Sequence, residues 1–213
     1  MTPSTLRNRD TYLSQLLATL AGKKNASNQT VPDWLLAIHR QATAFLQEET
    51  IPSNKDEEWR FTNLTGLLEQ QFSTVSTAPP TVNINSFEAT EAKQRLVFVN
   101  GTYCPDLSQI SAQPGLFVGN LAAAVDRGLS IEQYLAKQPG GEEVFTALNT
   151  ASIEDLAVVW VTANSIIPEP VQILFIATGD QALIIQPRVL VVAEHSSQFT
   201  IIEEYLHAAL PEK

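Results

Sequence analysis

The stretch KDEEWRFTNL, residues 55–64, separates a leading part of the chain with a helical pattern from a longer part with a strand pattern. We call it the signature segment. It combines charged side chains with two aromatic ones, Trp59 and Phe61. Ser53 and Asp56, three residues apart, indicate a short capped turn at its start. We interpret the segment as an amphipathic turn whose two aromatic side chains anchor the leading helices to another part of the protein.

The sequence before the signature segment predicts two amphipathic helices, near residues 4–21 and 33–49. Gly22 is placed to end the first, and Pro32 is tolerated at the start of the second. His39 lies beside the apolar stripe of the second helix, and we expect it at the surface or at its boundary. The apolar stripes consist of Tyr12, Leu13, Leu16, Leu17 and Leu20 in the first helix, and Trp34, Leu35, Ile38, Ala42, Phe45 and Leu46 in the second.

After the signature segment, residues 65–72 predict one further short helix, and the Ser/Thr/Pro-rich residues 73–81 predict a linker. The next clear pattern is a β-hairpin. Residues 95–99 and 102–104 flank the pair Asn100-Gly101, which readily adopts the positive φ angles of a type I′ turn. Short helices are expected near residues 120–127 and 131–136.

Four apolar runs follow residue 155, at 157–161, 171–177, 189–193 and 199–202. Each is apolar at nearly every position, which is typical of strands covered on both faces. No two-residue hairpin turn connects them, so they suit the coils of a parallel β-helix, and we expect parallel pairing among them. An antiparallel sandwich gives similar spacings. The pattern alone leaves both architectures open.

The composition excludes several classes of function. The chain has 213 residues, 44% of them hydrophobic and 17% charged, as expected of a globular protein. Its 13 basic and 23 acidic residues give a net charge of −10, which argues against binding to nucleic acid or to anionic lipid. No signal peptide or membrane span is expected. A single cysteine, Cys104, fits the cytoplasm or an equivalent reducing compartment.

Several motifs, in this order, resemble the SufD subunits of the SufBCD iron–sulfur cluster assembly complex. They are the signature segment, LVFVNG at 96–101, FTALNTA at 145–151, VVWV at 158–161 with Pro168 and Pro170, QILFIAT at 172–178, QPRVLVVAE at 186–194 and FTIIEEY at 199–205. The match covers most of residues 30–205.

The resemblance implies an α+β, mainly β fold, with a helical segment followed by the start of a right-handed parallel β-helix. The implied domains are a helical domain at 1–72, the linker at 73–81, and a β-rich domain at 82–213 that is mixed α/β to about residue 154. SufD chains are substantially longer, so we expect a fragment or a shortened paralogue without the family's C-terminal docking parts. The ending Leu210-Pro-Glu-Lys213 is no obvious cap for a β-helix. An uncapped end exposes unpaired backbone groups and favours a homodimer through that end.

The function implied by the resemblance is that of a non-enzymatic scaffold that acts with SufB-like and SufC-like subunits. The iron–sulfur cluster would be assembled transiently by the complex, with no cofactor bound by this chain alone. The alternative hypothesis is a carbohydrate-active or carbohydrate-binding β-helix protein, which would need a carboxylate cluster and exposed aromatic side chains along successive coils. A third is a free-standing interaction module.

No catalytic, cofactor-binding or metal-binding residue is assigned from the sequence. Cys104 has no second cysteine with which to ligate a cluster, so we interpret it as a small residue on the far strand of the hairpin. Glu194, His195, Glu203, Glu204 and His207 have loose metal-ligand spacing, but adjacent strand residues such as Glu203 and Glu204 point to opposite faces. A solvated acidic rim is the preferred interpretation. The chain contains no nucleophile elbow and no phosphate-binding loop.

Overall fold

The computed structural model describes residues 9–26, 31–74, 82–84, 87, 89–179 and 181–208. These residues fall into two compact units, each built from separated stretches of the chain. Unit 1 takes the described residues within 1–76, 136–154 and 181–184, and unit 2 takes those within 77–135, 155–180 and 185–213. The chain therefore leaves unit 1 and returns to it twice. Of the predicted linker, residues 75–81 lie outside the described residues, and Ser73 forms a parallel bridge with Leu183.

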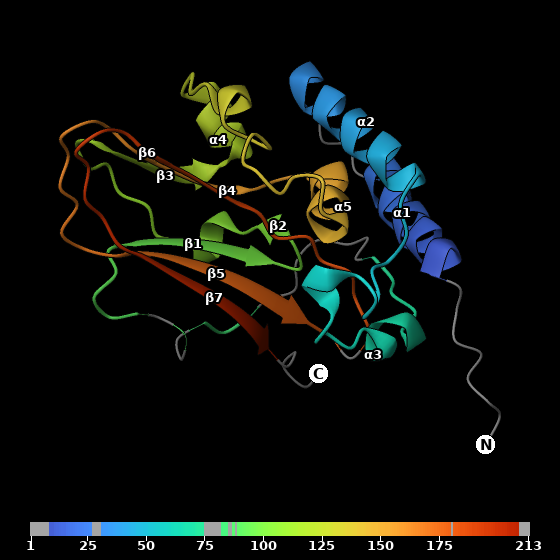
Figure 1. Ribbon diagram of the computed structural model, residues 1–213. Helices are drawn as coiled ribbons and strands as arrows, with labels where there is room; N and C mark the ends of the chain where they lie inside the picture. Colours follow the sequence, from blue (N-terminus) through green and yellow to red (C-terminus); the bar gives the residue numbers. More distant parts are fainter. Residues whose placement is uncertain are drawn as a thin grey trace. The chain divides into compact units, whose positions relative to one another are not determined.

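Unit 1 is helical, and two of its helices correspond to the two expected before the signature segment (Figure 1). The first continues past Gly22, so the predicted helix end there is wrong, and residues 1–8 lie outside the described residues. The expected short helix after residue 65 is present and ends at Glu69. The helices of unit 1 are α1 (Arg9–Ala26), α2 (Asp33–Gln47), the 3₁₀ turn η1 (Glu57–Trp59), α3 (Thr65–Glu69) and α5 (Val144–Ser152).

The buried face of α1 agrees with its predicted stripe, whereas α2 contains one unexpected residue. His39 is only 6% exposed, so the expectation of a surface position is wrong. It follows Leu35 by one helical turn and precedes Leu46 by two, and both leucines are buried. The histidine therefore belongs to the buried face of the helix. On α1, the side chains of Tyr12, Leu13, Leu16 and Leu20 are buried.

Helix α5 completes the core of unit 1, although the sequence pattern did not predict it as a helix. Its first turn is capped by Glu143, whose carboxylate accepts a hydrogen bond from the backbone N–H of Thr146 at 3.0 Å. Its buried side chains join those of α1 and α2 in one apolar cluster. Those side chains are Val144, Ala147, Leu148 and Ala151.

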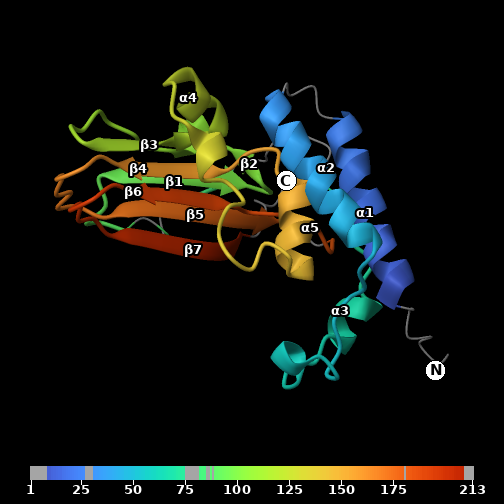
Figure 2. The same ribbon diagram turned by 45° about the horizontal axis from the view of Figure 1, so that its top comes forward.

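Unit 2 contains two sheets, which are seen as two layers in Figure 1 and overlap in the turned view of Figure 2. One sheet has the strand order β2-β1-β5-β7, and the other has the order β3-β4-β6. The strands are β1 (Gln94–Val99), β2 (Thr102–Tyr103), β3 (Leu116–Asn120), β4 (Ala157–Val161), β5 (Val171–Thr178), β6 (Val189–Ala193) and β7 (Ile201–Ala208). Short helices η3 (Pro105–Leu107), α4 (Leu121–Asp126) and η4 (Ile131–Gln133) connect them, and the latter two fall in the segments expected to be helical.

The last four strands pair as the sequence predicts. Strand β4 pairs in parallel with β6, with Ala157 opposite Val189, and β5 pairs in parallel with β7, with Val171 opposite Ile201. Successive strands therefore alternate between the two sheets. Parallel pairing is confirmed and the antiparallel alternative is wrong for these strands. The architecture as a whole is mixed α/β with two mixed sheets, because β2 and β3 add antiparallel pairs.

The predicted hairpin is also confirmed. Phe98 pairs with Tyr103 across it, and the φ angles of Asn100 and Gly101 are 51° and 81°. The Asn100 side chain does more than permit the turn, because its amide nitrogen donates to Thr178 Oγ1 at 2.7 Å and its amide oxygen accepts from the Thr178 backbone N–H at 2.9 Å. The turn is thereby joined to the end of β5.

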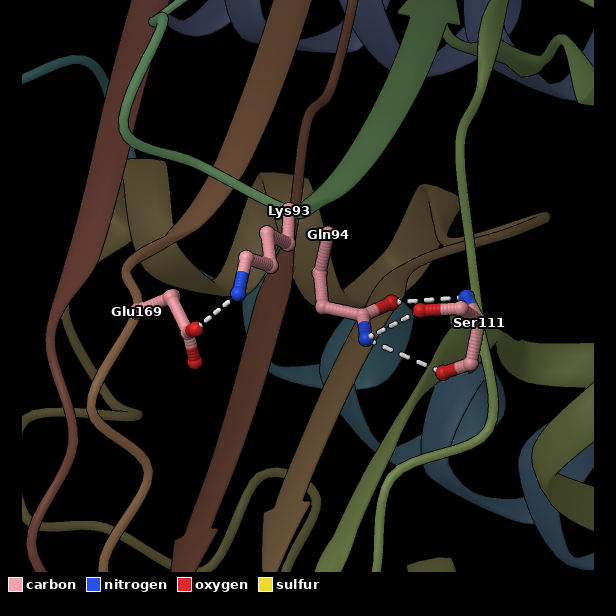
Figure 3. Close-up of polar contacts among 4 residues, drawn as sticks. All are labelled: Lys93, Gln94, Ser111 and Glu169. Carbon is pink, nitrogen blue, oxygen red and sulfur yellow. Dashed lines mark hydrogen bonds and ion pairs between the residues drawn. The ribbon is translucent and has the colours of Figure 1, made fainter.

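Strand β1 pairs in parallel with β5, with Gln94 opposite Val171, and side-chain contacts form near the start of these two segments (Figure 3). Lys93 and Glu169 form an ion pair between the two segments. The buried Gln94 side chain donates to the carbonyl and the hydroxyl of Ser111, each at 3.0 Å, and accepts from the Ser111 backbone N–H at 2.9 Å. The Gln94 amide thus bonds to the backbone of Ser111 as a neighbouring strand would, and its polar atoms are hydrogen-bonded in the interior.

Strands β4 and β5 are buried on both faces, as expected, but β6 and β7 are not. Side chains along β6 alternate between buried and exposed, and much of β7 is exposed. The prediction of two covered faces is wrong for these two strands. Both lie at the edge of their sheet, so fewer neighbours cover them.

Candidate functional site

The signature segment is held in place by hydrogen bonds at its start. The Asp56 carboxylate accepts from the Ser53 backbone N–H at 2.7 Å and from its hydroxyl at 3.1 Å, which confirms the predicted capped turn. These bonds hold the pKa of Asp56 below its usual range. Arg9, at the start of α1, donates to the carbonyls of Ile51 and Pro52. These hydrogen bonds therefore fix the direction in which the chain continues after α2.

The two aromatic side chains of the signature segment have different environments. The ring of Trp59 is partly buried and lies 5.2 Å from the ring of Phe145, between centroids, at an interplanar angle of 53°. Phe145 belongs to α5, so this contact lies within unit 1. Phe61, in contrast, is 94% exposed, so the expectation that it anchors the leading helices to another part of the protein is wrong.

Phe61 is one of the residues that line a hollow of about 430 Å³. The guanidinium carbon of Arg60 lies 5.5 Å from the centre of the Phe61 ring, in cation–π geometry, and its Nη1 lies 3.9 Å from a carboxylate oxygen of Glu57. The residues that line the hollow include two arginines and no acidic residue, although the chain carries a net charge of −10. They are Arg9, Asn54, Arg60, Phe61, Thr62, Asn63, Leu64 and Thr65. An exposed aromatic ring beside polar donors is typical of a protein–protein contact.

A second exposed surface lies in unit 2, along β7. Tyr205 is 62% exposed, and its ring stacks on Phe175 of β5 with 5.3 Å between centroids and an interplanar angle of 20°. Its hydroxyl donates to the Glu203 carboxylate. Burial, followed by the neighbouring Glu203 carboxylate, raises the pKa of Tyr205 to about 12, so the phenol is neutral at physiological pH. In the sequence, the mixture of polar and apolar residues in IIEEYLHA is the feature that indicates a partly exposed strand here.

The acidic and histidine residues with loose metal-ligand spacing are engaged separately. Glu204 accepts from the Gln172 amide at 2.7 Å, and His207 Nε2 lies 3.1 Å from the Gly179 carbonyl. Glu194 accepts from the Trp160 indole N–H at 2.7 Å and from the Ala163 backbone N–H at 3.0 Å. These bonds lower the pKa of Glu194. Among the residues that the structure describes, no three His, Cys, Asp or Glu side chains converge to hold a metal ion.

Cys104 directly follows β2 and is buried, with 9% of its surface exposed. It belongs to an apolar cluster that includes Val97, Val99 and Leu174. Burial raises the pKa of the Cys104 thiol, so the nucleophilic thiolate is disfavoured. The structure therefore supports a packing role for this side chain.

Asp155 shows how a polar group is accommodated inside unit 2. Its carboxylate accepts from the Asn120 amide at 3.0 Å and from the backbone N–H groups of Leu121 and Leu156 at 3.0 and 2.9 Å. Burial raises its pKa, against the lowering effect of these bonds. The contacts join the start of α4 to the start of β4 and give Asp155 a structural role.

None of the described helices has the length and apolar character needed to cross a lipid bilayer.

Comparisons with known proteins give a consistent relationship. A family model described as the SufBD protein N-terminal region matches residues 11–173. An iron–sulfur cluster assembly SufBD family protein of Synechocystis is 37% identical over 193 residues, which cover 86% of this chain and 42% of that protein. The iron–sulfur cluster assembly protein SufD of Bacillus subtilis is 26% identical over 84% of this chain and 43% of its own length. The chloroplastic protein ABCI7 of Arabidopsis thaliana is 23% identical, over 92% of this chain and 43% of its own length.

The chain thus spans about two fifths of the length of the curated relatives that it matches. The family model covers most of the chain, and the match includes the signature segment, the hairpin and the first parallel strands. The chain belongs to the SufBD family of iron–sulfur cluster assembly proteins and corresponds to the N-terminal region of that family.

Proposed function

We propose that this protein is a SufD-like scaffold component of an iron–sulfur cluster assembly complex and that it acts with SufB-like and SufC-like subunits. The observation that carries the proposal is the family match over residues 11–173. The SufD of Bacillus subtilis among the relatives supports the SufD-like assignment. The carbohydrate-active alternative has no comparable support.

We place the chain's contribution in binding rather than in catalysis. Two carboxylates with perturbed pKa values have hydrogen bonds that serve structure: Asp155 joins α4 to β4, and Glu194 joins Trp160 to Ala163. The iron–sulfur cluster is then the cargo of the complex, and its ligands come largely from other subunits, because this chain has a single, buried cysteine. A reducing compartment such as the cytoplasm suits this chemistry.

In this proposal, the parallel strands of unit 2 form the start of a right-handed parallel β-helix. Support comes from the alternation of successive strands between two sheets, with each strand paired in parallel to the second strand after it. Such a stack extends by adding further turns of the same kind.

The signature segment supplies a contact for a partner subunit. Trp59 packs on Phe145 and keeps the segment in place, whereas Phe61 and Arg60 project from it. An exposed phenylalanine costs little in the folded chain and contributes to binding when a partner removes it from water, by about 1.5–3 kcal/mol for a fully buried side chain.

Mixing the purified chain with the SufB-like and SufC-like subunits of its source organism tests the proposal. We expect a complex that elutes together in size-exclusion chromatography, with a mass that includes all components. The Phe61→Ala variant should weaken it, whereas Leu36→Ala, at a 40% exposed position on α2 in the same unit, should not. Separate elution of this chain at all concentrations would contradict the proposed function.

A further inference from the structure

The hollow beside the signature segment combines a basic lining with one exposed aromatic ring. Six of the eight residues that line it are polar or basic, and none is acidic. Its volume of about 430 Å³ lies within the range of ligand pockets, which is roughly 300–1,000 Å³. All eight residues belong to unit 1, so the hollow lies within one compact unit. Its chemistry can therefore be derived from these residues alone.

The two arginines that line the hollow are held to different degrees. Arg9 is partly buried and fixed, because its Nη1 donates to the backbone carbonyls of Ile51 and Pro52. Arg60 is exposed over 62% of its side chain, and its Nη1 lies 3.9 Å from a carboxylate oxygen of Glu57. That distance exceeds the length of a charge-assisted hydrogen bond, which is about 2.7–2.9 Å. Arg60 can therefore turn to an incoming carboxylate without breaking a strong contact.

Phe61 places an apolar ring beside the same guanidinium. The guanidinium carbon of Arg60 lies 5.5 Å from the centre of the Phe61 ring, and Phe61 is 94% exposed. The guanidinium is a forked donor that matches a carboxylate, and the ring is an apolar surface for a neighbouring side chain. Leu64, which is half-buried, adds a second apolar group to the lining. The surface thus suits an acidic residue with an apolar neighbour.

We propose that the hollow binds a short segment of a partner polypeptide that carries one carboxylate side chain next to one apolar side chain. The carboxylate pairs with Arg60, and the apolar side chain packs on Phe61. The inference rests on the proposed function in one respect, namely that this surface contacts a partner subunit. It adds the chemistry of the residues that the partner supplies.

Acidic side chains close to the hollow restrict which anions can bind. Glu57 and Glu58 are exposed and precede Arg60 in the same segment, whereas the carboxylate of Asp56 is held by Ser53. These groups tolerate a single carboxylate at Arg60 but repel a run of negative charges, and the net charge of −10 acts in the same sense. Polyacidic segments and nucleic acids are therefore disfavoured, and a segment with an isolated acidic residue is favoured.

Nuclear magnetic resonance titration of the purified chain with synthetic peptides tests this chemistry. Gly/Ser-rich peptides carry at their centre Leu-Glu, Leu-Gln, Ala-Glu or a run of Glu residues. We expect the Leu-Glu peptide to shift the amide signals of residues 60–65 and to bind most tightly. Replacing its Glu with Gln should weaken binding at least roughly tenfold, because a hydrogen bond between charged groups is lost. Replacing its Leu with Ala should weaken binding at least roughly threefold, because less apolar surface is buried.

Variants of the chain show whether Arg60 and Phe61 make these contacts. Arg60→Gln should remove most of the difference between the Leu-Glu and Leu-Gln peptides, and Phe61→Ala most of the difference between the Leu-Glu and Ala-Glu peptides. Arg40→Gln and Leu36→Ala, at exposed positions on α2 of the same unit, are the matched controls and should leave both differences unchanged. Arg60→Lys keeps the charge but loses the forked donor, so an intermediate affinity is expected.

Three results would overturn the inference: equal binding of the Leu-Glu and Leu-Gln peptides, tightest binding of the polyglutamate peptide, or no signal shift with any peptide at about 1 mM. Binding of inorganic phosphate without binding of the Leu-Glu peptide would also overturn it, since the hollow would then be a site for small anions. If Arg60→Gln does not fold, the comparison of peptides on the unmodified chain decides.

The titration needs no other subunit, so its outcome is separate from that of complex formation. A chain that does not join the assembly subunits but binds the Leu-Glu peptide would contradict the proposed function and retain this site. A chain that joins them but does not bind the peptide would retain the proposed function and contradict the site.

Discussion

The indole ring of Trp59 packs against the ring of Phe145, 5.2 Å between centroids, and so connects the signature segment to helix α5. The two residues are far apart in the sequence but belong to the same helical unit. This contact explains why a segment with so many charged residues has a defined position. It also separates the structural role of Trp59 from the exposed position of Phe61.

Replacing Trp59 with alanine should destabilise unit 1. Truncating a fully buried aromatic side chain costs about 3–5 kcal/mol, and Trp59 is only partly buried, so we expect a loss of about 2 kcal/mol in the free energy of unfolding. Urea denaturation followed by circular dichroism measures it. The matched control is Phe61→Ala, in the same segment but at a 94% exposed position, which should change stability by less than about 0.5 kcal/mol. Equal effects of the two variants would refute the assignment of roles.

The Asn100 side chain should contribute to stability independently of its turn conformation. Asn100→Gly keeps the positive φ angle accessible but leaves the buried Thr178 N–H without its acceptor. We expect a loss of about 1–3 kcal/mol, the usual cost of an unsatisfied buried donor. Asn164 has a similar φ angle of 58° at an exposed position, so Asn164→Gly is the control and should stay within about 0.5 kcal/mol of the parent. A similar loss in both variants would assign the effect to glycine itself.

Glu194 should make the protein less stable in acid. Its pKa is lower in the folded chain than in the unfolded chain, because the indole of Trp160 and the backbone of Ala163 donate to its carboxylate. The resulting stabilisation is complete above the unfolded pKa and is lost as the pH falls through the folded pKa. We therefore expect the free energy of unfolding to fall less between about pH 6 and about pH 3 in Glu194→Gln than in the parent chain.

The exposed Glu132 offers a charge-matched comparison, since Glu132→Gln removes the same charge without removing these hydrogen bonds. Asp155 has a raised pKa and acts in the opposite direction, since its contribution is present at low pH and is lost as the pH rises through its folded pKa. Asp155 is present in the parent chain, in Glu194→Gln and in Glu132→Gln, so its contribution is the same in all three and does not affect the comparison. Identical acid profiles for the two glutamine variants would rule out the proposed role of Glu194.

The sequence predicted the elements whose local pattern was unambiguous. Strands β4 and β6 coincide with their apolar runs, and the Asn100-Gly101 turn has the expected geometry. Strand β7 begins two residues later and extends further than its apolar run, because Glu203 is exposed and Glu204 accepts a hydrogen bond from the Gln172 amide. The second half of β7 therefore carries no continuous apolar signal.

The parts that could not be predicted depend on contacts between distant segments. Helix α5 belongs to unit 1 but follows residues 77–135 of unit 2 along the chain, and short apolar runs such as its own do not distinguish a helix from a strand. His39 is expected at the surface or at its boundary because it lies beside the apolar stripe, whereas the structure places it on the buried face of α2. The exposure of Phe61 also has no local signature. The sequence resemblance identified the family, and the structure showed which residues of its motifs are exposed.

Cluster assembly by the reconstituted components tests the central claim most directly. The SufB-like and SufC-like subunits of the source organism are incubated anaerobically with iron, a sulfide source and ATP, with and without this chain, and the bound iron and sulfide are measured over time. A role as an assembly scaffold predicts a higher rate or yield of protein-bound cluster when the chain is present, and a smaller increase with Phe61→Ala. A rate and yield that are the same with and without the chain would contradict it.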